Sequence, residues 1–162
     1  MKNVNDKTSL DPRVHPYRKD IAADFMEGRV DASSFVVGKK NRVGVAWAPV
    51  MTKPCPVNLD GENVLQASEL LFGESFTVFE DKDGWSWGQC GHDGYVGYVK
   101  SSNLFRNLNK PTHWVSALSS LVFPDSKGEF PPQMRLSMLA GVSVDMVEGE
   151  YAHLTSGGWI FL

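Results

Sequence analysis

Two cysteines and four histidines are the residues of this sequence that could supply a nucleophile, a general base or metal ligands. A cysteine nucleophile needs a thiolate beside a histidine that a third group orients. Only Cys90 and His92 lie close together in the sequence, and their spacing lets both side chains face the same way on a strand. Such a pair is common by chance, and no second pair stands at a metal-ligand spacing. We therefore predict a structural Cys90, no catalytic residue, no metal site and no cofactor.

Large aromatic side chains form the other candidate surface, one that could hold a short peptide. Trp85, Trp87, Tyr95 and Tyr98 are rigid and partly polar, which suits contact with a peptide and equally suits a barrel core. For the two tryptophans we favour the core. Tyr95 follows a turn bounded by glycines, so its hydroxyl can reach solvent or a ligand.

The stretch from 71 to 99 must position these aromatic residues. It alternates along its length and is interrupted twice by glycine-containing polar turns, which favours β-strands joined by hairpins. The expected strands start at Ser75, Trp85 and Tyr95, and the expected turns are 80–84 and 91–94. Gly97 in the third strand lets the backbone bend or another chain segment approach closely. These three strands predict an antiparallel meander, as in a small barrel.

The region before this meander predicts an arm and a short helix. Residues 1–19 are polar and contain Pro12 and Pro16, so they read as an arm that wraps or frays. Asp20 can cap a helix over 21–27, which Gly28 would end. Its apolar stripe would plug one end of a barrel, and consists of Ile21, Ala22, Phe25 and Met26.

Residues 29–63 predict a connector, a strand and a long loop. Lys39 and Lys40 at the end of the connector, with Arg42, indicate a solvated edge rather than a phosphate site. The alternation over 42–48 predicts a half-buried strand that pairs with the meander. Three prolines and an Asp-Gly turn in 49–63 predict a long loop, the first candidate for a binding wall.

The order of features in the meander recurs later in the chain. Residues 70–87 and 138–152 both run from an apolar pair and a glycine through an alternating strand to a turn and an aromatic residue. The second copy spans about 111–162. Two such small units would be marginal alone, and the segment between them is short, so we expect them to pack together.

Composition excludes several classes of protein. The 162 residues are 42% hydrophobic and 22% charged, with a net charge of −3, which gives no reason to expect nucleic acid as a partner. No apolar run approaches the length of a membrane helix, and the first twenty residues contain no apolar signal core. We therefore expect no membrane association and a cytoplasmic location.

Four segments of the chain carry a resemblance to a known family: LFGE at 71–74, DGWSWGQ at 83–89, DGYVGYV at 93–99 and the pre-barrel segment 10–30. They resemble the amino-terminal half of bacterial NlpC/P60 cell-wall peptidases. In that family, tandem bacterial SH3 (SH3b) barrels precede a cysteine peptidase domain. The resemblance implies a mainly β fold, with an arm and a short N-terminal helix in 1–40, one SH3b barrel in 41–107 and a second in 111–162.

The resemblance also implies a function. The family cuts the bond between γ-D-glutamate and a diamino acid in peptidoglycan stem peptides, but its Asp-Cys-Ser-Gly nucleophile motif is absent here. The chain would then be a non-catalytic region that stabilises the peptidase domain and shapes its substrate site. Its partners would be that domain and peptidoglycan-derived peptides.

The resemblance suggests substrate-binding residues as well. Tyr95 and Glu74 match positions that contact the free amine of an amino-terminal L-alanine, and Glu69 competes with Glu74 for the role of the acid. Trp85 is a further candidate. The alternative is a stand-alone SH3-like adaptor that binds cell-wall or proline-rich peptides. A third possibility, a hydrolase that uses Cys90, would require thiol-dependent cleavage by the purified chain.

Overall fold

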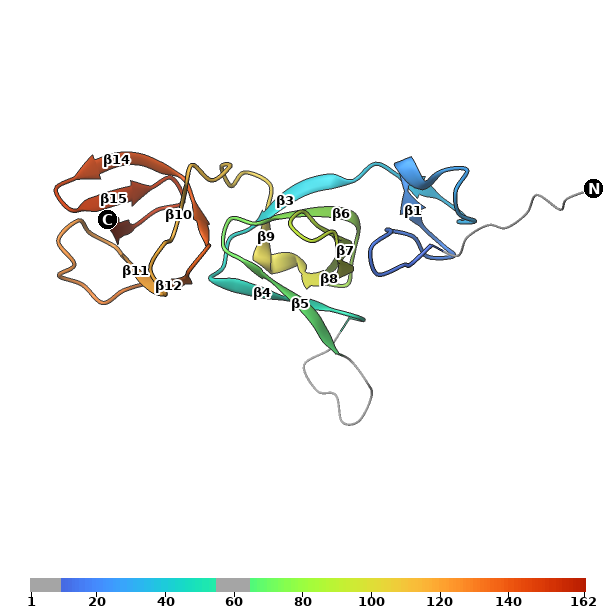
Figure 1. Ribbon diagram of the computed structural model, residues 1–162, viewed down its shortest axis with the longest axis horizontal. Coiled ribbons are helices and arrows are strands. Elements are labelled where there is room, and N and C mark those ends of the chain that lie inside the picture. Colours follow the sequence, from blue (N-terminus) through green and yellow to red (C-terminus); the bar gives the residue numbers. More distant parts are fainter. Residues whose placement is uncertain (1–9, 55–64) are drawn as a thin grey trace, which may run out of the picture.

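Figure 1 shows the computed structural model of the protein, which describes residues 10–54 and 65–162. Two sheets, of seven and five strands, and two two-stranded pairs account for the regular structure of these residues. The helical parts are two single-turn 3₁₀ helices, η1 (Asp24–Met26) and η2 (Ser101–Asn103). The mainly β fold predicted from the sequence is confirmed.

The seven-stranded sheet forms the first barrel. Its spatial order is β5-β4-β8-β7-β6-β3-β9. In chain order the strands are β3 (Lys39–Val43), β4 (Trp47–Met51), β5 (Gln66–Leu71), β6 (Ser75–Lys82), β7 (Trp85–Cys90), β8 (Val96–Lys100) and β9 (Leu104–Phe105). The predicted meander is β6-β7-β8. Its first turn places Asp83 and Gly84 at φ of 52° and 79°, the left-handed pair that matches the twist of a tight hairpin.

Glycines let the backbones of this barrel approach one another. A Cβ added to Gly97 in β8 would lie 2.6 Å from Val50 Cγ1 and 2.8 Å from the carbonyl oxygen of Met51 in β4. Real Cβ atoms do not occupy such positions, so β4 and β8 depend on glycine here. The close approach predicted at Gly97 is confirmed.

The strand predicted over 42–48 is wrong in its extent. It is divided into β3 and β4, because the chain turns at Gly44, whose amide donates to the Asn103 carbonyl (3.0 Å). The Phe105 ring from β9 lies where a Cβ of Gly44 would be. Pro49, assigned to the long loop, instead lies within β4, opposite Glu69. Val50 and Met51, also assigned to that loop, complete β4, and residues 52–54 follow the strand. Residues 55–63 of the predicted loop, with Cys55 and the Asp60-Gly61 turn, are outside the described residues.

The second barrel repeats the topology of the first. Its five-stranded sheet has the order β12-β11-β16-β15-β14, and β10 pairs separately with β13. This order corresponds to β5-β4-β8-β7-β6, with β10–β13 in the place of β3–β6, so the predicted duplication is confirmed. The strands are β10 (His113–Trp114), β11 (Ser119–Phe123), β12 (Met134–Ser137), β13 (Gly141–Val142), β14 (Val144–Glu148), β15 (Tyr151–Leu154) and β16 (Trp159–Phe161).

The helix predicted over 21–27 is not formed. Ala22 and Ala23 are extended as β1 (Ala22–Ala23), which pairs in parallel with β2 (Phe35–Val36), and only the single turn η1 follows. The expected cap at Asp20 is missing because its carboxylate is held by Arg18 instead. Seven residues are too few to stabilise an isolated helix, so strand pairing and burial decide the conformation.

The N-terminal segment covers one face of the first barrel. Ile21, Ala22, Ala23 and Met26 are buried against Phe79, Trp87 and Val96. Phe25, expected in the buried stripe, is 55% exposed. Residues 10–19 lie along the barrel, and the amide of Val96 donates to the Arg13 carbonyl (2.7 Å). For these described residues, the arm wraps rather than frays.

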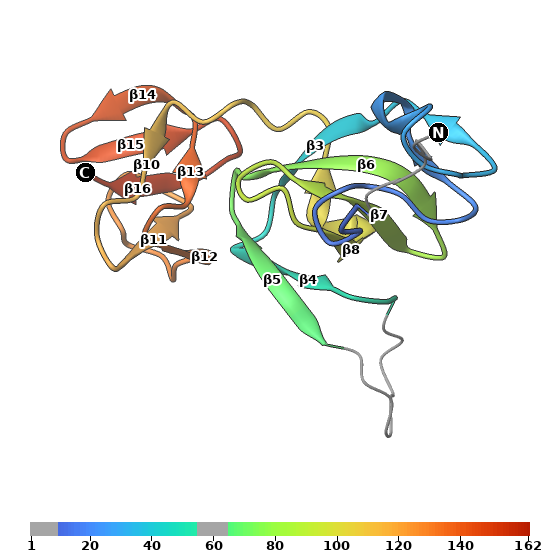
Figure 2. The same cartoon turned by 45° about the vertical axis from the view of Figure 1, so that its right-hand side comes forward.

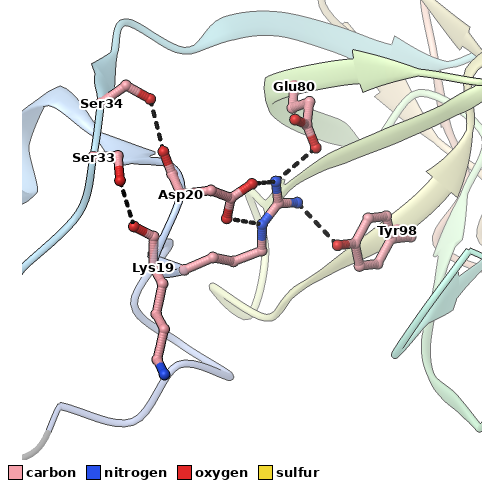
Figure 3. A network of polar contacts seen from close by, with 7 residues as sticks. Lys19, Asp20, Ser33, Ser34, Glu80 and Tyr98 are labelled. Atoms are coloured by element: carbon pink, nitrogen blue, oxygen red, sulfur yellow. Dashed lines mark hydrogen bonds and ion pairs between the residues drawn. The ribbon is translucent and has the colours of Figure 1, made fainter.

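Arg18 connects this segment to the barrel through Asp20, Glu80 and Tyr98, which are labelled in Figure 3. Its guanidinium donates to Asp20, to Glu80 of β6 (2.8 Å) and to the Tyr98 hydroxyl of β8 (2.9 Å). It also lies over the Trp87 ring, 4.6 Å from the ring centroid. These acidic partners raise the pKa of Arg18 above its ordinary value, against the opposing effect of burial.

Phe72 joins the two barrels, which lie side by side in both views (Figures 1 and 2). It belongs to the turn between β5 and β6, yet its side chain is 3% exposed and packs in the core of the second barrel, with Val115, Leu136 and Ala140. The Gly141 amide donates to the Phe72 carbonyl (2.8 Å). The expected packing between the barrels is therefore confirmed.

Candidate groove between the barrels

A charged groove lies beside the Phe72 contact, between the two barrels. It consists of two adjoining pockets of about 370 Å³ and 310 Å³, which share Glu74, His92, Trp114 and Leu139. We name them by their charge. The acidic pocket adds Glu69, Leu70, Leu71 and Asp93 to the shared residues. The basic pocket adds Lys40, Arg42, Gly73, Ser75, Gly91, Lys110, Pro111 and Gly141.

Glu74 stands at the centre of this groove because the turn after β5 places it there. Its Oε2 accepts a hydrogen bond from the Leu71 amide (2.9 Å), and its amide donates to the Leu71 carbonyl (3.1 Å). The carboxylate is thereby held in one orientation. Within the described residues its Oε1 makes no hydrogen bond, so this oxygen is open to a ligand.

Two further carboxylates complete the acidic pocket. Glu69 is exposed on β5. Asp93 lies in the turn between β7 and β8, where its Oδ1 accepts from the Tyr95 amide (2.9 Å) and its Oδ2 from the Ser68 hydroxyl (3.2 Å). Three acids around one small pocket create a site of negative potential.

Tyr95 is attached to this pocket through its backbone and does not line it. Its side chain is half-buried against the core of the first barrel. Its amide orients Asp93, as described above. Trp85 lies at the far end of β7, paired with Lys82 and Lys100, and is not part of the groove. The structure thus brings Glu69 and Glu74 together, places Tyr95 next to them and leaves Trp85 apart; the binding roles of all four stay predictions.

Cys90 belongs to the core of the first barrel. Its side chain is 3% exposed, packed with residues such as Phe76 and Val99. Burial, and then the negative charges of Asp93 and Glu74, raise the pKa of the thiol to about 12. His92 is exposed in the turn, and no hydrogen bond joins it to Cys90 among the residues described. The structural role predicted for Cys90 agrees with this geometry.

The groove contains residues that the sequence did not mark as functional. Trp114 and Leu139 come from the second barrel and Lys110 from the segment between the barrels, so only the packing of the two repeats brings them to Glu74. Lys40 and Arg42, interpreted as a solvated edge, line the basic pocket. Asp93 lies in the turn predicted over 91–94 and was not among the predicted site residues. The sequence gives no signal for Leu139, because the two repeats align Gly73 with Gly141 in sequence and with Leu139 only in the structure.

Two further properties concern the whole described chain. Over residues 10–54 and 65–162 there is no group of three His, Cys, Asp or Glu side chains that could hold a metal ion. In the same residues no helix has the length and apolar character needed to cross a membrane.

Comparison with known proteins supports the fold and its class. The family of bacterial dipeptidyl-peptidase SH3 domains matches residues 63–104. A solved NlpC/P60 family protein from Bacillus cereus ATCC 10987 has a similar structure, with a TM-score of 0.52 and 15% sequence identity. The match covers 76% of this chain and 54% of that protein. No curated protein matches the chain.

Of residues 63–104, which match the family of bacterial dipeptidyl-peptidase SH3 domains, the described part lies within the first barrel. The resemblance predicted from the sequence, to the SH3b region of an NlpC/P60 peptidase, is confirmed. The matched family is the SH3 module of such peptidases, a non-catalytic domain, and the chain spans about half the length of its structural neighbour.

Proposed function

We propose that this chain is the tandem SH3b region of an NlpC/P60 cysteine endopeptidase that cuts γ-D-glutamyl-diamino acid bonds of peptidoglycan stem peptides during cytoplasmic cell-wall recycling. The barrels stabilise the peptidase domain and shape its substrate site, and they perform no chemistry. The SH3 match over 63–104 and the likeness to an NlpC/P60 protein support this assignment. The raised pKa of Cys90 also speaks against a nucleophile within the described part of the chain.

The observation that carries the proposed site is the meeting of Glu69, Glu74 and Asp93 in one pocket. An ammonium group has three N–H donors and a positive charge, and carboxylates are its strongest partners. The acidic pocket is therefore suited to the free amino terminus of a peptide. Tyr95 contributes by holding Asp93 in place.

The gene downstream of the Leu162 codon provides the first test. An in-frame peptidase domain with an Asp-Cys-Ser-Gly motif is the expected result. A stop codon directly after Leu162 would contradict the proposal and favour the adaptor.

A kinetic test addresses the acidic pocket in the protein that carries this peptidase domain. Glu74→Gln should lower kcat/KM about tenfold or more for a peptide with a free L-alanine terminus, because a charge-assisted hydrogen bond is lost. The N-acetylated peptide should be cut equally by both proteins. Glu129→Gln, an exposed acid far along the chain in the second barrel, is the control. Unchanged kinetics for Glu74→Gln would remove this residue from the site.

The second candidate function is the stand-alone adaptor, which the exposed Trp114 in the groove favours, since aromatic side chains often receive peptides in SH3-like folds. Calorimetric titration of the 162-residue chain with muropeptides and with PxxP peptides separates the two functions. The adaptor predicts tight binding by the chain alone, whereas an SH3b region that completes a peptidase predicts weak binding.

A further inference from the structure

We infer that Lys40, Arg42 and Lys110 form a carboxylate subsite, and that the groove therefore takes short peptides that carry both a free ammonium group and a carboxylate. The inference deepens the proposed function and rests on it for the ammonium end. The acidic and basic pockets share Glu74 and Trp114, so a single ligand can extend from one into the other.

Strand parity directs two of these cations into the groove. Asn41 and Val43 of β3 are 7% and 0% exposed, so the alternate residues Lys40 and Arg42 face outward. Lys110, just before the second barrel, lines the same pocket. Cations from two distant segments thus converge where the barrels meet.

These cations form no ion pair within residues 10–54 and 65–162. The guanidinium of Arg42 donates one hydrogen bond, from Nη1 to the Gly73 carbonyl (2.8 Å), which orients the group and leaves its other donors available. Lys40 and Lys110 form no ion pair with any described residue. Glu74 is the one carboxylate in the lining of the basic pocket, against three cations. A chain with a net charge of −3 therefore carries a local excess of positive charge here.

The opposite wall of the groove is apolar and exposed. Trp114 and Leu139 are 64% and 65% exposed, so they are not buried by other parts of the described chain. Leu139 has a φ of 71°, a left-handed conformation that is unfavourable for leucine. Leu139 occupies the turn position that Gly73 holds in the first barrel. The backbone hydrogen bonds correspond: the Gly73 amide donates to the Val43 carbonyl, and the Leu139 amide donates to the Val115 carbonyl.

This strained leucine is consistent with a binding surface. Strained backbone positions cluster at ligand sites, where a particular side chain must be presented. The side chain of Leu139 faces both pockets together with Trp114. Each pocket lies at the small end of the range for small-molecule sites, which suits a few amino-acid residues and not a folded partner.

NMR titration of the ¹⁵N-labelled 162-residue protein with three matched peptides tests this inference. The probes are tri-alanine, N-acetyl-tri-alanine and tri-alanine amide, at millimolar concentrations that detect weak binding. The reporters are the Trp114 indole N–H and the amides of Gly73 and Gly141. We expect tri-alanine to shift these signals and each blocked peptide to bind about tenfold more weakly, the loss that corresponds to one charge-assisted contact.

The double variant Lys40→Gln/Lys110→Gln assigns the carboxylate end. Because Arg42 is the one cation of the subsite that this variant keeps, its preference for tri-alanine over the amide should be clearly smaller than that of the unchanged protein, while it still prefers both to the N-acetylated peptide. Lys100→Gln, an exposed lysine at the end of β8, should behave as the unchanged protein.

The outcomes separate the inference from the proposed function. Discrimination against the N-acetyl peptide alone leaves the ammonium pocket standing and overturns the carboxylate subsite. Discrimination against the amide alone supports the subsite and contradicts the ammonium pocket. Absence of any shift at the three reporters overturns both.

Discussion

Burial keeps the Cys90 thiol protonated at neutral pH. The side chain packs inside the first barrel, and the negative charges of Asp93 and Glu74 disfavour a negatively charged thiolate at Cys90. A pKa of about 12 leaves a very small fraction of nucleophilic thiolate at pH 7. We therefore expect no thiol chemistry from Cys90 in the groove next to it.

The raised pKa of Cys90 predicts a specific loss of stability in alkali. The unfolded thiol ionises near pH 9 and the folded thiol near 12. The contribution of the protonated Cys90 thiol to the stability of the folded protein is complete below pH 9. It is lost as the pH rises toward 12, because in this range only the unfolded state releases the proton. Between these values the free energy of unfolding should fall by about 1.4 kcal/mol per pH unit. Urea titrations at several pH values, compared with Cys90→Ala, measure this slope; equal slopes would mean that the thiol ionises as readily in the folded protein.

Arg18 concentrates four contacts on one half-buried guanidinium. Its side chain is 24% exposed, whereas Arg13, which pairs with Asp11, is 72% exposed. The difference in exposure decides how much each ion pair contributes, because water screens charges at the surface.

Replacement of Arg18 should therefore destabilise the protein more than replacement of Arg13. We expect Arg18→Ala to lower the free energy of unfolding by about 2 kcal/mol, through loss of charged hydrogen bonds and of the contact with Trp87. Arg13→Ala should cost much less, because water screens its exposed ion pair with Asp11. Urea unfolding followed by tryptophan fluorescence measures both. An equal cost for the two variants would show that Arg18 does not hold the N-terminal segment.

The β5–β6 turn is the element that couples the barrels. It supplies Phe72 to the second core and Glu74 to the groove within three residues. Gly73 between them has a φ of 81°, and a Cβ there would meet the Gly141 carbonyl oxygen. The turn therefore sets both the contact between the barrels and the site beside it.

Truncation of Phe72 should destabilise the second barrel. Phe72→Ala removes a buried ring and should cost about 3–5 kcal/mol in calorimetric or urea unfolding. Phe130→Ala, at a residue that is 60% exposed, is the matched control and should change stability by about 0.5 kcal/mol or less. A small effect of Phe72→Ala would show that the second core closes without it.

The equivalent turn in the second barrel allows a test of strain. Glycine adopts the left-handed conformation without strain, so Leu139→Gly should stabilise the folded state by about 1 kcal/mol. It also makes the unfolded chain more flexible, which lowers the free energy of unfolding. Stability should stay the same or rise by up to about 1 kcal/mol, while tri-alanine binding weakens. The reciprocal Gly73→Ala should destabilise the protein. A clear loss of stability in Leu139→Gly would mean that the leucine is kept for packing and not for the groove.

Across the whole molecule, the sequence predicted those features that depend on residues close together in the chain. The β6-β7-β8 meander depends on turn residues next to the strands they join, so alternation and glycine positions were sufficient. The repeat was also visible, although its register was not: the sequences align Gly73 with Gly141, whereas the structure aligns it with Leu139.

Features set by distant residues were missed. The break between β3 and β4 depends on Phe105, far along the chain. In place of the predicted N-terminal helix, Ala22 and Ala23 form a strand that pairs with β2. The groove requires Glu74, Trp114 and Leu139 to meet, which no single stretch encodes. Of the predicted site residues, the structure brings Glu69 and Glu74 into one pocket. The sequence did not predict that Lys40, Arg42 and Lys110 lie beside them.

The position of Phe72 also has a consequence for how the protein is made. Because one piece of the second hydrophobic core is supplied by an earlier part of the chain, a fragment from 111 to 162 lacks it. During synthesis the first barrel emerges from the ribosome before the second and presents this ring as an anchor. Residues 111–162 then complete their fold on a surface that is already formed, so the order of translation assists assembly.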